Sequence, residues 1–367
     1  MRPLSDLLVL DFSTLLPGPM ATLLLVEAGA RVVKIEPPSG DAMRSYPPIW
    51  GKDSALFAML NRGKESLALD LKSSDGLKQV RKLAKEADVL VEQFRPGVMA
   101  RLGLGPIELA ELNPRLIYCS ITGYGQTGPR SNEAGHDLNF LGDTGYLALS
   151  SGDISAPVQP AAPIGDIAGG SYPAVINILL ALEERRQTGR GRHIDIAMSE
   201  NLFPMTYWAL ATGFATNEWP GNGTDLVTGS SPRYRVYATR DRKGLVVAAL
   251  EEKFWSIFCA RLDLDVSFRD DSVDPARTMG EIARIVIAED AEFWTNRFSG
   301  ADCCCSIMSD ISHAVRDPHF VKRGVFAHTV VNERGDTMPA LPIPIDPGFR
   351  HEPDVARSAP ALRRALD

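Results

Sequence analysis

The sequence has few of the features that mark secreted, membrane or nucleic-acid-binding proteins. Its five cysteines include three consecutive ones, which gives neither a disulfide framework nor the ligand spacing of a metal site. No apolar run reaches the length of a transmembrane helix, and acidic residues interrupt the N-terminal apolar stretch before a signal-peptide pattern can form. The net charge of −7 disfavours a nucleic-acid surface. We therefore expect a protein of a reducing, cytoplasmic compartment with no metal, membrane or nucleic-acid partner.

The overall composition is that of a globular protein. Hydrophobic residues make up 44% of the chain and charged residues 23%. A chain of 367 residues is long enough for one large domain and a smaller one.

Short apolar segments alternate with helical patterns through the first half of the chain. Leu77, Val80, Leu83 and Ala84 form an apolar stripe at helical spacing. Strands are predicted at 7–12, 31–36, 87–94, 115–121 and 193–198. Strands that alternate with helices are typical of an α/β fold with a parallel sheet. The sequence therefore predicts a parallel sheet, and the family resemblance described below implies that it forms a Rossmann-like large domain.

A change in composition after residue 216 suggests a domain boundary. The stretch 217–232 is rich in Gly, Asn, Ser and Pro and is predicted to be a linker. A hairpin and helical segments follow, which indicate a small α+β domain over 233–315. We expect residues 1–216 to form the large domain, and the family resemblance described below implies that residues 316–367 return to it.

Two further apolar helices are predicted between residues 166 and 216. An apolar helix is predicted over 172–186, and it begins either beside Pro173 or earlier, near Asp166, with a bend at the proline. The apolar stretch 199–216 is predicted to be one long helix.

His136 and Asp166 are the candidate chemical pair. His136 lies in the stretch GHDLNFL, and an imidazole can carry a proton near neutral pH. Asp166 lies in PIGDIAGG, among small residues at the start of a helix. A histidine–aspartate sequence is usually structural, and an aspartate before a helix is usually an N-cap. Set on opposite sides of one carbon, however, the two groups could remove a proton from one face and return it to the other.

The glycine-rich stretch GYGQTG (123–128) follows a predicted strand and matches a dinucleotide-binding spacing. Pro129 and a polar run follow it where an apolar helix should begin, so we do not interpret it as a dinucleotide loop. Glu36 ends a strand as a ribose-binding acid would, but no glycine loop precedes it. The glycines are expected to let the backbone approach a ligand closely.

Basic residues lie near the predicted ends of strands. Arg62 and Lys64 flank a glycine, and Arg95 follows a strand, where side chains of a parallel sheet face the ligand crevice. Such groups suit phosphates, although a solvated basic loop has the same spacing. Glu251 lies at a strand-to-helix junction, where an acid is also favoured by the helix dipole.

Taken together, these segments resemble the α-methylacyl-CoA racemases, within the class III CoA-transferase superfamily. The superfamily-wide segments are LLVLDFSTLLPGPMAT, EAGARVVKIEPP, NRGK, LDLK, FRPGVMARLGLG and TGYGQTGPR. The GHD stretch with His136 is the racemase-like mark, because the transferases usually have a tyrosine there. The position of Asp166 matches both branches.

The resemblance implies an interlocked homodimer acting on acyl-CoA, with the active site between the large domain of one chain and the small domain of the other. His136 and Asp166 would flank the α-carbon, and Glu251 would orient His136. CoA would enter as part of the substrate, with no further cofactor. The residues expected to bind CoA are Arg62, Lys64, Arg95, Tyr124, Gly125 and Asp137.

Two positions depart from the family pattern. Arg233 and Arg235 stand where the racemases have aromatic and acidic residues, and an arginine near the acyl pocket could receive a carboxylate. Pro37 follows Glu36, where some members have an arginine for the CoA phosphate.

Two enzymatic hypotheses follow. In the first, His136 and Asp166 racemise a 2-methylacyl-CoA through an enolate that backbone N–H groups at a helix N-terminus stabilise. In the second, Asp166 attacks the thioester and forms an anhydride, and CoA passes to another acid. A protein that binds acyl-CoA without turnover is a third reading, which the His136, Asp166 and Glu251 set disfavours.

Overall fold

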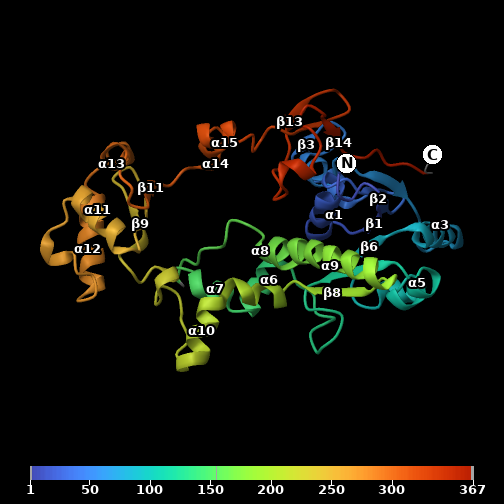
Figure 1. The fold of residues 1–367 in the computed structure, drawn as a ribbon, viewed down its shortest axis with the longest axis horizontal. Coiled ribbons are helices and arrows are strands. Elements are labelled where there is room, and N and C mark those ends of the chain that lie inside the picture. Colours follow the sequence, from blue (N-terminus) through green and yellow to red (C-terminus); the bar gives the residue numbers. More distant parts are fainter. Residues whose placement is uncertain (1, 154, 365–367) are drawn as a thin grey trace. The chain divides into compact units, whose positions relative to one another are not determined.

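The computed structural model describes residues 2–153 and 155–364 (Figure 1). The first unit comprises Met1–Thr144, Pro160–Thr206 and Pro318–Asp367, and the second comprises Gly145–Gln159 and Tyr207–Asp317. The structure thus assigns 145–159 and 207–216, which we expected in the large domain, to the second unit, together with the predicted linker. A local reason is that the amide of Asn222 exchanges hydrogen bonds with the backbone of Gly152, at 2.6 and 3.3 Å.

A six-stranded parallel sheet forms the centre of the first unit. Its strand order is β5-β2-β1-β6-β7-β8, which is the Rossmann order, with the direction of winding reversing between β1 and β6. The strands are β1 (Leu8–Phe12), β2 (Arg31–Glu36), β5 (Glu65–Ala68), β6 (Val89–Glu92), β7 (Ile117–Thr122) and β8 (His193–Ala197). The five predicted strands and their parallel arrangement are confirmed, and β5 is an additional edge strand.

Helices cover both faces of this sheet. On one face, apolar side chains of α3, α4 and α5 pack on Leu10, Val33 and Leu90. Helices α1 and α9 contact the sheet strands from the other side. The helices are α1 (Pro17–Glu27), α2 (Ala55–Asn61), α3 (Ser74–Glu86), α4 (Val98–Arg101), α5 (Pro106–Leu112), α6 (Asp137–Asp143), α8 (Ile164–Asp166), α9 (Tyr172–Thr188) and α15 (Pro318–Lys322).

The helix expected over 172–186 begins earlier, at Ile164. Helix α8 continues through a π-helical turn, η2 (Ile167–Ser171), into α9. The backbone N–H of Tyr172 donates to the carbonyl of Ile167, so the helix widens by one residue just before Pro173, which has no N–H to donate. Of the two starts considered, the earlier one is therefore correct.

By length and composition alone, the helix Ile164–Thr188 could cross a membrane. The sequence expectation that no segment reaches that length is therefore wrong for this helix. Core helices of soluble proteins pass the same test, and α9 contacts α1, β7 and β8.

Chain segments that follow the second unit complete the first one. Strand β12 (Thr329–Val331) pairs with β13 (Thr337–Pro339) and β14 (Arg357–Ser358). A separate short pair, β3 (Ile49–Trp50) with β4 (Asp53–Ser54), lies in the N-terminal part of the same unit. The backbone N–H groups of Gly63 and Ala68 donate to the carbonyls of Ser358 and Arg363.

The second unit is built on the antiparallel sheet β11-β10-β9. The predicted hairpin is confirmed as β9 (Tyr234–Ala238) and β10 (Gly244–Ala248), and β11 (Cys305–Ile307) joins it. Its core includes Trp255, Phe258 and Phe298, whose rings stack with centroids 5.6 Å apart. The helices are α7 (Tyr146–Ser150), α10 (Tyr207–Thr216), α11 (Glu252–Leu262), α12 (Pro275–Val286), α13 (Ala291–Phe298) and α14 (Ile311–Ala314). The long helix expected over 199–216 is instead a 3₁₀ turn, η3 (Glu200–Thr206), which contains Pro204, followed by α10.

Candidate active site

His136 lies at the N-terminus of α6, where the backbone of the neighbouring residues is tightly packed. Its N–H donates to the Oδ1 of Asn139 at 3.1 Å, and its imidazole is exposed. The preceding residue, Gly135, has no room for a side chain, because a Cβ there would lie 2.7 Å from Phe140 and 3.1 Å from the hydroxyl of Tyr124. The structure thus fixes the backbone of His136 and leaves its ring accessible.

Asp137 joins α6 to the helix that carries Asp166. The Oδ1 of Asp137 accepts the backbone N–H of Asp166 at 3.0 Å, and the carboxylate also accepts the N–H of Gly165. Gly165 permits this approach, since a Cβ there would lie 3.1 Å from the same Oδ1. The carboxylate of Asp137 is therefore engaged in holding two helix N-termini together.

The side chain of Asp166 is partly buried beside charged neighbours. Burial and the charge of Asp137 together raise the pKa of Asp166 to about 6, and His136 opposes the shift. The structure thus brings His136, Asp137 and Asp166 into one electrostatically coupled group. A carboxyl group with a pKa near 6 can both donate and accept a proton near neutral pH.

The π-helical turn η2, which follows Asp166, is anchored on two sides. A Cβ at Gly169 would lie 2.3 Å from the carbonyl oxygen of Met198, so only glycine allows this contact. Asn201 donates to the carbonyl of Gly169 at 2.9 Å, and the hydroxyl of Ser171 donates to that of Pro17 at 2.8 Å. Such turns occur frequently at functional sites, and this one holds the backbone that follows Asp166.

The loop after β7 supports the same region. Tyr124 packs edge-on against Phe140 at 5.3 Å and donates its hydroxyl to Asp143 at 2.6 Å. Gly125 has a φ of +82°, which disfavours any other residue. No helix follows this loop until α6, which agrees with the interpretation that GYGQTG is not a dinucleotide-binding loop.

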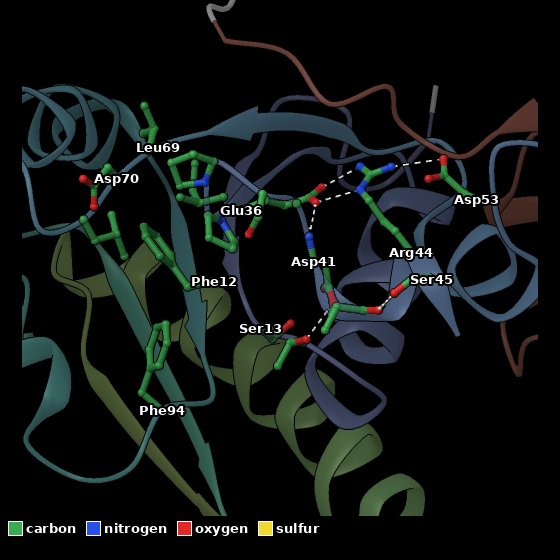
Figure 2. A pocket seen from close by; sticks show the side chains of 18 of the residues that line it. Phe12, Ser13, Glu36, Asp41, Arg44, Ser45, Asp53, Leu69, Asp70 and Phe94 are labelled. Atoms are coloured by element: carbon green, nitrogen blue, oxygen red, sulfur yellow. Dashed lines mark hydrogen bonds and ion pairs between the residues drawn. The ribbon is translucent and has the colours of Figure 1, made fainter. Parts of the chain in front are cut away.

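A cavity of about 840 Å³ lies at the carboxyl ends of the first unit's strands (Figure 2). Ligands of open α/β sheets bind at this edge, where the winding reverses. Apolar side chains of Phe12, Ile35, Leu69 and Phe94 line part of the cavity. The cavity is large enough for a nucleotide-sized ligand.

Charged groups on another side of the cavity are already paired. Arg44 bonds both carboxylate oxygens of Glu36, at 2.7 and 2.8 Å, and reaches Asp53 at 3.1 Å (Figure 2). Glu36 also accepts from Ser66 and from the backbone of Asp41. The carboxylate of Glu36 is therefore occupied and cannot act as a ribose acceptor in this arrangement.

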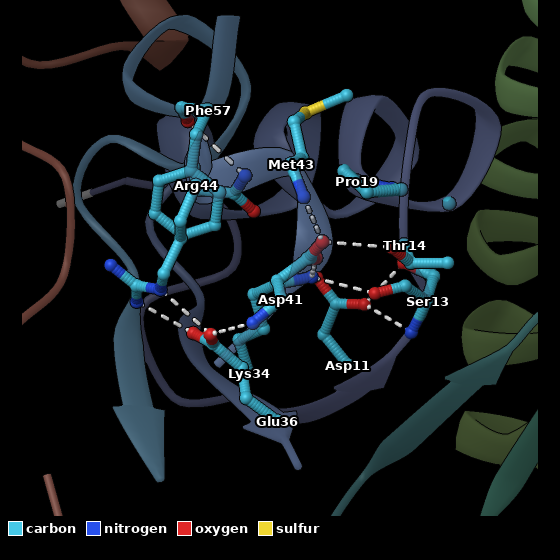
Figure 3. Close-up of polar contacts among 12 residues, drawn as sticks. Asp11, Ser13, Thr14, Pro19, Lys34, Glu36, Asp41, Met43, Arg44 and Phe57 are labelled. Carbon is cyan, nitrogen blue, oxygen red and sulfur yellow. Dashed lines mark hydrogen bonds and ion pairs between the residues drawn. The ribbon is translucent and has the colours of Figure 1, made fainter. Parts of the chain in front are cut away.

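Arg62 and Lys64 do not face a ligand, which corrects the sequence expectation. Arg62 is buried and pairs with Glu27 at 2.8 Å. The ammonium group of Lys64 is fully buried 3.0 Å from Asp11, and burial lowers the pKa of Lys64 to about 8. Nearby, Lys34 pairs with Asp41 at 2.9 Å in the same buried polar layer (Figure 3). These cations stabilise the interior of the first unit.

Other basic residues are better placed for phosphate. Arg95 is exposed and follows Phe94, which lines the cavity. Lys52 and Lys72, which sequence reasoning missed as ligands, line the cavity itself and are exposed. Lys72 follows β5, an edge strand that was not predicted from the sequence, so its place at the edge where ligands bind was not foreseen.

The remaining predicted residues belong to the second unit. Glu251 is exposed and occupies the N-cap position of α11, between β10 and the helix, without a side-chain capping hydrogen bond. Arg233 pairs with Asp271 at 2.7 Å and with Glu252 at 2.9 Å, so it is not available for a substrate carboxylate. Arg235 lines a separate cavity. Within residues 2–153 and 155–364, no cluster of three metal-ligating side chains occurs.

Fold and site together define an enzyme architecture built around a Rossmann-type sheet and a histidine–aspartate pair. The CoA-transferase family III profile matches residues 4–364, and the chain belongs to that family. It is 33% identical to the human α-methylacyl-CoA racemase, over 95% of this chain and 90% of that protein. It is 31% identical to the acetyl-CoA:oxalate CoA-transferase of Acetobacter aceti, over 98% and 93% of the two chains.

The fold is also similar to that of solved family structures. A CaiB/BaiF family protein from Brucella suis superimposes with a TM-score of 0.83 at 26% identity, covering 99% of this chain and 97% of the other. The chain is therefore an enzyme of a family that includes both racemases and transferases.

Proposed function

We propose that this protein racemises 2-methylacyl-CoA thioesters by moving the α-proton from one face of the carbon to the other. His136 takes the proton of one epimer, the charge moves to the thioester oxygen as an enolate, and protonated Asp166 returns a proton to the opposite face. In the reverse direction the two residues exchange roles. CoA enters as part of the substrate, and the reaction requires no further cofactor.

The observation that carries this proposal is the pKa of Asp166. A two-base racemase needs a second group that is protonated in part of the molecules at working pH. Burial and the charge of Asp137 raise the pKa of Asp166 to about 6, and His136 is close enough to oppose that shift. An ordinary exposed aspartate would be protonated in far fewer molecules.

Two backbone donors are available for the enolate. The carboxylate of Asp137 occupies the N–H groups of Gly165 and Asp166 at the start of the long helix, so these two groups are not available to the oxyanion. In the described chain, by contrast, no hydrogen bond engages the N–H groups of Asp137 and Leu138 at the start of α6. A preformed donor at such a position is worth ~3–4 kcal/mol in the transition state.

The cavity at the sheet edge supports binding of the CoA nucleotide. Its apolar lining suits an adenine ring, and Lys72, Lys52 and the nearby Arg95 suit phosphates. Arg44, although it lines the cavity, is already paired with Glu36 and contributes less free charge.

CoA transfer is the second candidate, because the relatives include transferases at similar identity. With a pKa of about 6, the carboxylate of Asp166 is mostly ionised at pH 7.5, as a nucleophile must be. It would attack the thioester to form an acyl anhydride and release CoA, which would then pass to another acid.

One experiment separates the two reactions. A single epimer of a 2-methylacyl-CoA is incubated in D2O with and without a free acid such as succinate. Racemisation predicts deuterium at the α-carbon and loss of optical purity that do not depend on the acid. CoA appearing on the acid without α-exchange would overturn the racemase proposal in favour of transfer.

Substitutions then assign the roles. His136→Gln should abolish α-exchange, whereas His313→Gln, at an exposed histidine paired with Asp310, should leave it unchanged. Acyl transfer that persists in His136→Gln without exchange would also count against racemisation. Glu251→Gln tests whether Glu251 orients His136. Light scattering tests the proposed homodimer, for which the measured mass should be twice that of the chain.

A further inference from the structure

Four arginines of the first unit surround a single carboxylate, that of Glu27. Glu27 ends α1, which leads from the carboxyl end of β1 to the amino end of the parallel strand β2, so it lies at the sheet edge opposite the cavity proposed to bind CoA. Its Oε1 accepts from Arg62 at 2.8 Å and its Oε2 accepts from Arg350 at 3.3 Å. Arg2 and Arg357 complete this arginine cluster.

The charges of the arginine cluster do not balance. Its four guanidinium groups are positive, and Glu27 supplies one negative charge. Among the residues that the structure describes, no other carboxylate forms an ion pair with any of the four arginines. Burial and the charges of the three other arginines lower the pKa of Arg357 to about 10, although Glu27 opposes the shift. Arg357 is still positive at neutral pH, so the cluster has an excess of positive charge.

Some N–H groups of the cluster also lack an acceptor. The side chain of Arg350 is only 8% exposed, and its Nε is buried without a hydrogen-bonding partner in the described chain. Buried donors are nearly always paired. The guanidinium of Arg357 has no hydrogen bond to a described residue either, and it packs so closely on Gly63 that a Cβ there would lie 2.5 Å from its Nη1. The cluster therefore has positive, partly buried donors without acceptors.

His351 adds a neutral donor to the cluster. Arg2 donates to the Nδ1 of His351 at 3.2 Å, and because an arginine can only donate, the ring proton must be on Nε2. This Nε2 lies 3.7 Å from Glu27, which is too far for a hydrogen bond. Burial and the charge of Arg357 hold the pKa of His351 below its usual range. The imidazole is therefore neutral at pH 7 and has an N–H to donate.

A small oxyanion has the properties that the cluster lacks. Phosphate supplies negative charge together with several acceptor oxygens, and guanidinium groups bind such oxygens through charge-assisted hydrogen bonds. The ligand must be small, because the protein itself encloses the Nε of Arg350. Chloride supplies a single atom and bridges fewer donors.

We propose that Arg2, Arg350 and Arg357 bind a small inorganic oxyanion of the phosphate type, which links residues 350–358 to the end of α1. The site is separate from the proposed reaction and does not rest on it, since the described lining of the cavity proposed to bind CoA includes none of these arginines. The phosphate groups of CoA offer the same chemistry, and the experiment separates the two sources.

The test titrates potassium phosphate into the protein by calorimetry, with potassium chloride keeping the ionic strength constant. The wild-type protein should bind phosphate, and phosphate should raise its thermal midpoint more than chloride does, because a ligand of the folded state stabilises it. Arg357→Gln should weaken the affinity for phosphate roughly 10- to 100-fold, the range for a hydrogen bond to a charged group. No binding by the wild type, or equal stabilisation by chloride, would overturn the proposal.

Two further variants show whether the phosphate binds in this cluster. Arg186 is exposed and pairs with Glu183 at 2.9 Å, so Arg186→Gln is the matched control and should keep the wild-type affinity. Glu27→Gln removes the carboxylate that repels the anion and should bind phosphate more tightly. If Glu27→Gln does not fold, Arg357→Gln decides alone, because its side chain has no hydrogen bond to lose. Affinity equal to that of the wild type in Arg357→Gln would show adsorption elsewhere and overturn the proposal.

Titration with CoA separates the two sources of phosphate. Inorganic phosphate bound at the cluster should not displace CoA, and Arg357→Gln should leave the dissociation constant of CoA unchanged. Competition between phosphate and CoA, together with weaker CoA binding in Arg357→Gln, would instead assign the cluster to CoA. Phosphate should also slow hydrogen exchange of the backbone amides of residues 350–358. Unchanged exchange in the presence of bound phosphate would refute the proposed link to α1.

Discussion

Replacing Lys64 by methionine should destabilise the first unit without weakening CoA binding. The ammonium group is fully buried and donates to Asp11, Thr22, Asn61 and the carbonyl of Pro19, at 2.8–3.0 Å. Methionine fills a similar volume but supplies no donor. The change leaves the buried carboxylate of Asp11 without its nearest cation.

The expected loss is about 3–5 kcal/mol, the usual result of removing one partner of a buried ion pair. The free energy of unfolding of a unit of this size falls by ~3 kcal/mol per M urea. The urea concentration at the unfolding midpoint should therefore fall by about 1 to 1.7 M. Lys78→Met is the control, because the Lys78 side chain is exposed and pairs only with Asp75 at 3.6 Å. Its midpoint should remain close to that of the wild type.

Calorimetric titration of CoA into the folded variant at low temperature completes the test. If Lys64 has the structural role described here, the dissociation constant of CoA should be unchanged. A variant with wild-type urea resistance and a tenfold weaker affinity for CoA would refute this reasoning and restore the phosphate role.

Three further outcomes are expected. In the direction in which Asp166 donates the proton, the rate of racemisation should decline as pH rises through about 6. Asp137→Asn should move that decline to lower pH, because it removes a charge that raises the pKa of Asp166. Because the pKa of Asp166 is raised from 3.8 in the unfolded chain to about 6 in the folded protein, the free energy of unfolding falls as pH rises between these two values and stays lower above them. Asp166→Asn should therefore raise the thermal midpoint at pH 8 and hardly alter it at pH 4, and an equal rise at both would contradict the assigned burial. Gly169→Ala should lower the thermal midpoint and the rate of α-exchange, since its Cβ would lie 2.3 Å from the carbonyl oxygen of Met198. Unchanged values of both would show that the backbone of η2 accommodates the added methyl group.

The parallel sheet could be predicted because its strands are buried on both faces. Segments such as Leu8–Phe12 and Val89–Glu92 therefore read as short apolar runs between helical patterns. The position of Asp166 at a helix start was also predictable, because small residues surround it locally, whereas the helix that follows His136 was not predicted. Their proximity depends on Asp137, whose partner N–H groups lie 28 and 29 residues later, and no local pattern reveals it.

The prediction for Lys64 failed because its environment is set at long range. Gly63, with a φ of +76°, leads into Lys64, whose partner Asp11 lies 53 residues earlier. Charge next to a glycine predicts a basic loop, but it does not tell which side chain turns inward. Lys72 is the reverse case, since its sequence surroundings are unremarkable in charge and the cavity beside it is formed by strands distant in sequence.

The division of the first unit into three chain segments has a consequence for the order of folding during synthesis. The second unit is completed once residue 317 has been made, but the first still lacks its last segment. Until that segment arrives, the N–H groups of Gly63 and Ala68 and one donor of Arg44 lack their partners Ser358, Arg363 and Pro360. Domains made in one piece usually fold from the N-terminus onward as the ribosome proceeds. In this chain the later-encoded unit should reach its native state first, and the Rossmann-type unit should close around its strands only after residues 358–363 have been made.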